Sequence, residues 1–195
     1  MPLPTPPMLL TFMLAGELWL MRSRLSKDTS READRGSLRL LLIVIGASVG
    51  LAWQAKRTFP QANFDVLFNL APAVLTGVHW MGLVIFFAGI CLRWYSMAHL
   101  GRLFTFDVAV AADHRVIDSG PYHYIRHPAY SGSLLSFVGL GVCGGNAVSL
   151  LALVAPIVLA FSRRIAIEEA ALTSALGHCY SDYAERTKRL LPYVY

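Results

Sequence analysis

The sequence predicts an all-α integral membrane protein with about five transmembrane helices. Of its 195 residues, 55% are hydrophobic and 15% are charged, whereas a soluble domain carries about 25% charged residues. The apolar residues gather in runs that approach the roughly 20 residues a helix needs to cross a bilayer. Basic residues separate these runs, so the net charge of +5 does not form the single basic face typical of nucleic-acid binders. We therefore expect one membrane domain over residues 1–195, with lipids and not nucleic acid around it.

Three apolar runs fill the first half of the chain, so residues 1–98 are expected to form three spans. The run from Met8 to Met21 contains Glu17, and its basic residues follow it instead of preceding it, which favours a membrane anchor over a cleaved signal peptide. A second span is expected from Leu40 to Ala55, and a third from Leu70 to about Ala98. The third run contains one charged residue, Arg93, and its side chain is expected to extend to the lipid headgroups.

Two further apolar runs predict a helical hairpin in the second half. They cover Pro128 to Val142 and Ala147 to Phe161, and the residues CGGN between them are typical of a tight turn. Each run is shorter than an ideal span, so the hairpin is expected to be thin or partly buried. Arg163 and Arg164 are expected to end the hairpin, and the pattern from there to Tyr183 predicts an amphipathic helix that extends into the cytoplasm.

Five crossings from an external N-terminus would place three polar segments on one side: residues 22–39, residues 99–127 and the C-terminal tail. These segments hold six, three and five basic residues, fourteen together, whereas the other side holds two. Cytoplasmic loops carry an excess of Lys and Arg. We therefore expect these segments and the C-terminus to be cytoplasmic, the N-terminus to lie on the opposite side, and residues 22–39 to form a solvated loop or helical hairpin tip.

Ionisable residues concentrate on this predicted cytoplasmic face. Residues 120–132, GPYHYIRHPAYSG, come to the same side as Arg164 and Glu168. Pro128 suits a first helical turn, whose free amides could receive an anionic group. Arg164 and Glu168 are four residues apart and share a helix face. They form either a surface ion pair, worth about 0 to 1 kcal/mol, or a site where the carboxylate accepts hydrogen bonds from a diol or amine and the guanidinium holds a carboxylate.

Five sequence elements follow one another in a specific order. RHPAY at 126–130 precedes the hydrophobic hairpin, the pair Glu168 and Glu169, a G-x-x-Y-x-x-Y stretch at 177–183 and RLLP at 189–192. This order resembles the isoprenylcysteine carboxyl methyltransferase family, integral membrane enzymes that use S-adenosylmethionine, and in particular its short prokaryotic-type members. The resemblance covers roughly the C-terminal half, so it implies that residues 99–195 are the S-adenosylmethionine-binding catalytic half. The long eukaryotic enzymes carry additional N-terminal spans that this chain lacks, so acceptance of a prenylated protein is not assumed.

The resemblance also implies a cofactor pocket, formed by the loop before the fourth helix and by the C-terminal helix. Glu168 is implied to bind the cofactor and Arg164 to bind the methyl acceptor, which makes these two the catalytic residues. Arg126, His123 and Glu169 are implied to support the shape of the pocket. The remaining cofactor-binding residues that the resemblance implies are His114, Arg115, Val116, Ile117, Tyr122, His127, Pro128, Ala129 and Tyr130.

The function implied by the resemblance is methyl transfer from S-adenosylmethionine to a lipophilic acceptor at the membrane, with S-adenosylhomocysteine as product and no metal. The expected reaction is carboxyl methylation of an isoprenylcysteine-like substrate. The alternatives are a phospholipid-type N-methyltransferase and an NADPH-dependent sterol reductase, which share an RHP-type motif, and a non-enzymatic scaffold whose loops bind headgroups. The glutamate pair followed by G-x-x-Y-x-x-Y favours methyl transfer.

Overall fold

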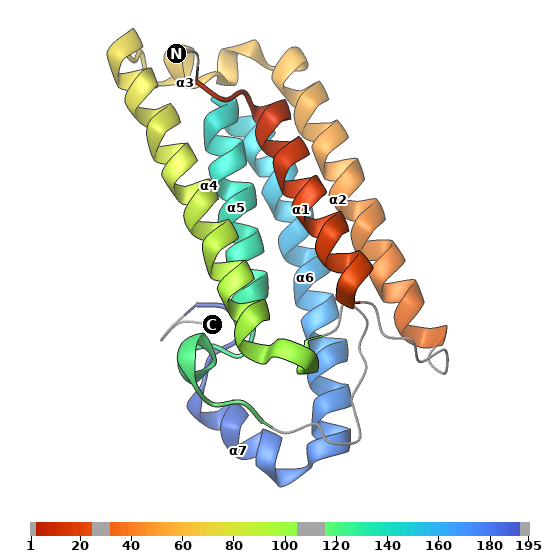
Figure 1. Ribbon diagram of the computed structural model, residues 1–195. Helices are drawn as coiled ribbons and strands as arrows, with labels where there is room; N and C mark the ends of the chain where they lie inside the picture. The colour runs from red at the N-terminus through yellow and green to blue at the C-terminus, as the bar shows by residue number, and fades with distance from the viewer. Residues whose placement is uncertain (1–2, 25–31, 105–115, 192–195) are drawn as a thin grey trace.

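The chain folds into a bundle of long helices that lie side by side (Figure 1). The computed structural model describes residues 3–24, 32–104 and 116–191. Within these ranges it contains no β-strand, only two isolated bridges. The five long helices are α1 (Pro6–Arg24), α2 (Glu32–Thr58), α4 (Pro72–Leu100), α5 (Pro128–Gly144) and α6 (Ala147–Leu176).

Three of these helices contain segments long and apolar enough to cross a membrane, namely Gly36–Thr58, Pro72–Leu100 and Ala147–Leu176. In α1 the apolar part, Pro6–Leu20, is shorter, and α5 has 17 residues. The expected all-α membrane protein is therefore confirmed, whereas the count of five crossings stays a prediction.

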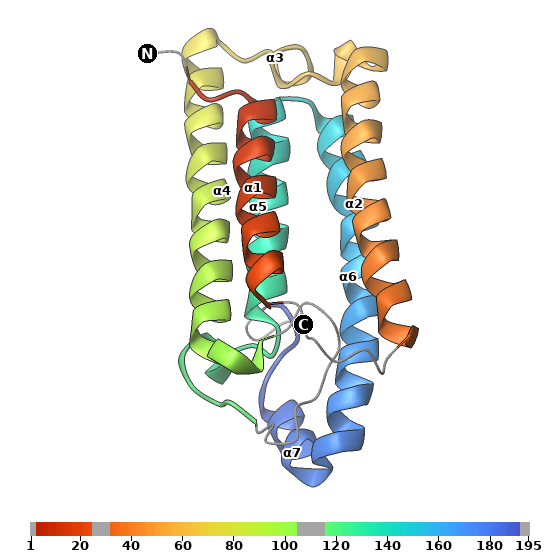
Figure 2. The same cartoon turned by 45° about the vertical axis from the view of Figure 1, so that its right-hand side comes forward.

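Successive long helices run in opposite directions, so one end of the bundle collects the polar segments (Figures 1 and 2). The start of α2 lies at this end, together with the short helices η2 (Gly101–Leu103), η3 (Gly120–His123) and α7 (His178–Arg186). The predicted gathering of residues 22–39, 99–127 and the C-terminal tail is confirmed for their described residues. We call this end the site end.

Close contact between α4 and α5 fixes the position of α5. A Cβ atom on Gly89 would lie 2.5 Å from the carbonyl oxygen of Gly132 and 2.4 Å from Oγ of Ser136. Real Cβ atoms do not come so close to backbone, so a side chain at Gly89 would force the helices apart. Phe86 and Phe137, 0% and 1% exposed, fill the core beside this contact. The start of α5, which carries the RHPAY residues, is thereby held against α4.

At the opposite end, the predicted turn between α5 and α6 is confirmed. Gly145 adopts a left-handed conformation with φ 68°, and Asn146 is the N-cap of α6, accepting a hydrogen bond from the amide of Ser149 at 2.9 Å. The Asn146 side chain also donates to the carbonyl of Phe59 at 2.9 Å and to Oδ1 of Asn63 at 2.8 Å. One buried amide therefore ties this turn to the segment around η1 (Pro60–Ala62) and α3 (Phe64–Leu67).

Two predicted boundaries are wrong for the same physical reason. Arg163 and Arg164 do not end a helix, because α6 continues through them to Leu176 and breaks only at Gly177, whose φ is 55°. The predicted start of the second span at Leu40 is likewise too late, because α2 begins at Glu32, within the segment expected to be a solvated loop or helical hairpin tip. Charged residues end an apolar run, but Arg, Glu, Ala and Leu are all good helix formers. The second arm of the hairpin is therefore 30 residues long, which is longer than the apolar run from Ala147 to Phe161 predicted.

The prediction for Arg93 is also wrong. Its side chain does not extend to the headgroups: the residue is 9% exposed, and its guanidinium binds the carboxylate of Glu17 on α1 through Nε at 2.5 Å and Nη2 at 2.6 Å. Two opposite charges that lie in apolar surroundings stabilise each other, since each would be costly to bury alone.

Candidate functional site

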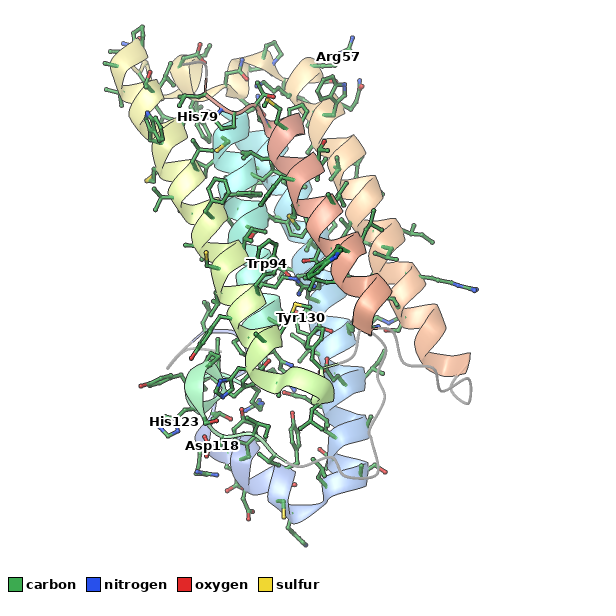
Figure 3. All side chains as sticks on the ribbon, viewed as in Figure 1. Arg57, His79, Trp94, Asp118, His123 and Tyr130 are labelled. Atoms are coloured by element: carbon green, nitrogen blue, oxygen red, sulfur yellow. The ribbon has the colours of Figure 1, made fainter. Side chains whose placement is uncertain are left out.

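Three residues that the sequence singled out meet at the site end of the bundle. Nε of Arg164 on α6 donates to the hydroxyl of Tyr130 on α5 at 3.1 Å, and this hydroxyl donates to Oε2 of Glu168 at 3.1 Å. Nη1 of Arg164 donates to Oγ of Ser37 on α2 at 2.8 Å. We call these four residues the Arg164 group. Figure 3 shows Tyr130 within the bundle, toward the end that carries α7, with Asp118 and His123 nearer the rim.

Spacing along two helices explains this meeting. One helical turn separates Arg164 from Glu168, so both point to the same side of α6. Tyr130 lies in the first turn of α5, and its ring packs edge-on against Phe161 on α6 with the centroids 5.0 Å apart. Arg164 is 4% exposed, whereas Glu168 is half-buried. The neutral Tyr130 hydroxyl thus orients a buried guanidinium and a more accessible carboxylate at once.

Glu169, the next residue on α6, has very different surroundings. Its Oε1 accepts from Nε of Arg126 at 2.8 Å and lies 3.2 Å from Nε2 of His127, and its Oε2 accepts from Nε and Nη2 of Arg189 at 2.9 and 2.8 Å. We call these four residues the Glu169 cluster. The Glu169 side chain is 13% exposed, so its charge is balanced inside the protein by its basic neighbours.

The Glu169 cluster joins the start of α5 to the segment that follows α7. The amide of Arg126 donates to the carbonyl of Lys188 at 2.7 Å, and that of His127 to the carbonyl of Arg189 at 3.0 Å. Nη1 of Arg126 also donates to the carbonyls of Ala184 and Thr187. The predicted supporting roles of Arg126 and Glu169 agree with this geometry. His123 instead lies at the rim, where Nδ1 is 3.1 Å from Oδ1 of Asp118.

The tyrosines of the G-x-x-Y-x-x-Y stretch have mainly internal contacts. The hydroxyl of Tyr183 donates to the carbonyl of Tyr122 at 2.6 Å, and that of Tyr122 to the carbonyl of Ser96 on α4 at 3.3 Å. Burial raises the pKa of Tyr122, and the negative charge of Glu168 raises it further. Both phenols therefore stay neutral donors that link α7, η3 and α4. Tyr180 is buried, and its hydroxyl has no hydrogen-bond partner among the residues that the structure describes.

The other predicted cofactor-binding residues differ in location and in burial. Val116 and Ile117 are half-buried in the segment before η3, while Pro128 and Ala129 are buried at the start of α5. The side chain of His127 faces Glu169. The predictions for His114 and Arg115 fall outside the described residues.

The start of α5 has fewer free amides than a first helical turn can offer. Pro128 has no amide hydrogen, and the amides of Tyr130 and Ser131 both donate to the carbonyl of His127, at 3.0 and 3.1 Å. The carbonyl of the N-cap residue therefore takes up two donors that an anion could otherwise use.

Sequence reasoning missed two features near the site. Ser37 gave no signal, because a serine in a polar connection is common and its contact to Arg164 spans 127 positions. The pairing of Glu17 with Arg93 had a signal: each is an ionisable residue inside an otherwise apolar run, and such residues pair with one another inside membranes.

The described residues contain no group of three or more His, Cys, Asp or Glu side chains arranged to hold a metal ion. The Arg164 group itself offers a guanidinium, a carboxylate and two hydroxyls. Such a set can bind and orient a ligand that carries a carboxylate together with hydroxyl or amine donors.

The fold and this site define a helical membrane protein with a polar, charge-bearing site at one end of its bundle. Its fold resembles that of a solved eukaryotic intramembrane Ras methyltransferase, an isoprenylcysteine carboxyl methyltransferase, with a TM-score of 0.63. The match covers 98% of this chain and 68% of that one, with 21% identity, so it shows the fold.

Comparison of sequences identifies the family. Residues 80–174 match the model of the isoprenylcysteine carboxyl methyltransferase (ICMT) family. A probable protein-S-isoprenylcysteine O-methyltransferase of Oryza sativa subsp. indica is 34% identical over 149 residues, which are 72% of this chain and 78% of the relative. The Schizosaccharomyces pombe protein-S-isoprenylcysteine O-methyltransferase is also 34% identical, over 70% of this chain and 56% of the relative. The chain therefore belongs to the isoprenylcysteine carboxyl methyltransferase family and is a methyltransferase.

Proposed function

We propose that this methyltransferase uses S-adenosylmethionine to methylate the carboxylate of an isoprenylcysteine-like acceptor at the membrane. The observation that carries the proposal is the difference between the two neighbouring glutamates. Glu169 is balanced by Arg126, His127 and Arg189, whereas Glu168 accepts a hydrogen bond from the neutral hydroxyl of Tyr130. A carboxylate has about four acceptor positions, so Glu168 retains acceptor capacity for a ligand.

The residues present fit the methyl donor. S-adenosylmethionine offers ribose hydroxyls and an ammonium group, both of which donate hydrogen bonds that a carboxylate accepts. Glu168 would hold one of these groups, with Tyr130 fixing its orientation. The other predicted cofactor residues would surround the donor from the segment before α5. When bound, S-adenosylmethionine supplies a methyl group on a sulfonium, which is already activated for displacement.

The proposed role of Arg164 is to bind the acceptor carboxylate. Guanidinium groups bind carboxylates through two parallel hydrogen bonds, and Arg164 is oriented by two hydroxyls, those of Tyr130 and Ser37. Because the residue is 4% exposed, its attraction for a carboxylate is weakly screened by water. Arg164 would thus place the acceptor oxygen and Glu168 the donor, and positioning of the two reactants lowers the barrier.

Binding and turnover test this proposal. We expect purified protein to bind S-adenosylhomocysteine saturably in calorimetry, and to transfer a labelled methyl group to an S-prenylated cysteine with a free carboxylate. The matched acceptor whose carboxylate is replaced by a carboxamide should remain unmethylated. Methylation of a phospholipid amine would favour the N-methyltransferase alternative, and NADPH binding without S-adenosylhomocysteine binding would favour the reductase. Absence of all ligand binding would favour the scaffold.

We further propose that the site end faces the cytoplasm. Cys179 on α7 is exposed there; Cys91 on α4 is also exposed, whereas Cys143 is buried, so the labelling of Cys179 is the part that Cys179→Ser abolishes. A membrane-impermeant thiol reagent should therefore label Cys179 in inside-out vesicles and not in intact cells, with Cys179→Ser as the control. Labelling in intact cells would reverse the proposed orientation.

A further inference from the structure

A buried ion pair beside the site connects α1, α4 and the start of α5. The guanidinium of Arg93 binds both oxygens of Glu17, at 2.5 and 2.6 Å, and the two side chains are 11% and 18% exposed. Nη1 of Arg93 also donates to the carbonyl of Ala129 at 3.2 Å. Arg93 therefore binds Glu17 through Nε and Nη2, and the Ala129 carbonyl through Nη1.

The second contact is the informative one. Ala129 lies between Pro128 and Tyr130 in the first turn of α5, so Arg93 holds the backbone immediately before the tyrosine that orients Arg164 and Glu168. The carbonyl of Ala129 also accepts a hydrogen bond from Oγ of Ser133 at 3.1 Å. Contacts of this kind fix the rotation of the first turn and hence the direction of the Tyr130 side chain.

A purely structural role would be a costly way to join these helices. Burial of two charges is often less stabilising than well-packed apolar side chains of the same size, and α4 and α5 already touch closely along their glycines. Ionisable residues inside a membrane protein usually serve its function. Arg93 lies within the part matched by the family, residues 80–174, whereas Glu17 lies outside it. The counter-charge is therefore supplied by a helix that the family match does not cover.

We infer that Glu17 and Arg93 are positioning residues, through which α1 holds the first turn of α5 in the orientation that binds the methyl donor. Glu17 fixes the guanidinium, the guanidinium fixes the Ala129 carbonyl, and Tyr130 then points at Glu168. This inference rests on the proposed function, since it assigns donor binding to that site. Neither residue touches the donor in this arrangement.

Glu17→Gln is the first test, because it keeps the shape of the side chain and removes its charge. We expect the Kd for S-adenosylhomocysteine, measured by calorimetry, to rise by about 3- to 10-fold, the effect of one weakened hydrogen bond. Asn146→Ala is the matched control: it loses contacts at the opposite end of the bundle, so it should lower the unfolding temperature and leave that Kd unchanged.

The swapped variant Glu17→Arg with Arg93→Glu separates positioning from stabilisation. The swap can restore an ion pair between α1 and α4, but a glutamate at 93 cannot donate to the Ala129 carbonyl. We therefore expect its unfolding temperature to recover relative to Glu17→Gln while the Kd stays raised. Recovery of wild-type affinity by the swap would overturn the inference, as would wild-type affinity in Glu17→Gln. If the swap does not fold, Glu17→Gln against Asn146→Ala decides. A wild-type protein that binds no S-adenosylhomocysteine would contradict the proposed function itself.

Discussion

The Glu169 cluster and the Arg164 group meet through adjacent residues of α6, Glu169 and Glu168, yet these two carboxylates have different partners. In the cluster, a carboxylate is surrounded by basic side chains that balance it. In the group, the contacts to Arg164 and Glu168 include the neutral hydroxyls of Tyr130 and Ser37. Ion pairs join chain segments by neutralising charge, whereas hydroxyls orient charged groups through hydrogen bonds. The first arrangement suits a structural junction and the second a ligand site.

The largest expected effect comes from removing the charge at the centre of the cluster. Glu169→Gln would leave Arg126, His127 and Arg189 close together without their counter-charge, so we expect the free energy of unfolding to fall by about 3 to 5 kcal/mol. Chemical denaturation of the purified protein in detergent measures this loss. A loss below about 1 kcal/mol would contradict the structural role of the cluster.

The matched change in the other region should affect binding instead. Glu168→Gln removes a charged carboxylate that accepts a hydrogen bond from the neutral hydroxyl of Tyr130, so we expect the Kd for S-adenosylhomocysteine to rise by about 10- to 100-fold, as for one charge-assisted hydrogen bond. The unfolding free energy should change little. Calorimetry together with denaturation tests both statements, and unchanged affinity with reduced stability would reverse the assignment of the two glutamates.

Removal of one orienting hydroxyl should have a smaller effect. In Tyr130→Phe, Arg164 loses an acceptor and Glu168 loses a donor, while the ring contact with Phe161 is retained. We expect the affinity for the methyl donor and kcat/KM each to fall by about 3- to 10-fold, with little change in unfolding temperature. A neutral result in both assays would mean that Tyr130 does not orient these side chains.

The smallest effect is expected for a hydroxyl that belongs to neither region. Tyr180 is buried and its hydroxyl is unpartnered, so Tyr180→Phe should raise the unfolding free energy, by about 1 kcal/mol. Tyr183→Phe is the matched control, because that hydroxyl donates to Tyr122 and its removal should lower stability. A lower affinity for the methyl donor in Tyr180→Phe would show that this hydroxyl contacts the ligand.

Much of the fold could be predicted from the sequence because apolar runs report directly on membrane helices. The hairpin turn at Gly144, Gly145 and Asn146 was predictable for a similar reason, since it depends on local residues. The C-terminal end of α6 was not, because Arg163 and Arg164 end an apolar run without ending a helix. Helix continuation follows backbone propensity, and the membrane boundary follows polarity.

For the site, the resemblance implied different roles for Glu168 and Glu169, but the sequence did not show the contacts that distinguish them. Sequence alone placed Glu168 and Glu169 side by side, and adjacent residues on a helix point about 100° apart. Which of them faces Arg126 and Arg189, and which faces Tyr130, depends on how α6 is rotated in the bundle. Likewise, the sequence contained Glu17 and Arg93 as isolated charges in apolar runs, and only the packing of α1 against α4 and α5 brings them together. Local pattern determined the helices and the kinds of residue at the site end, while contacts across tens of positions decided which charges are balanced.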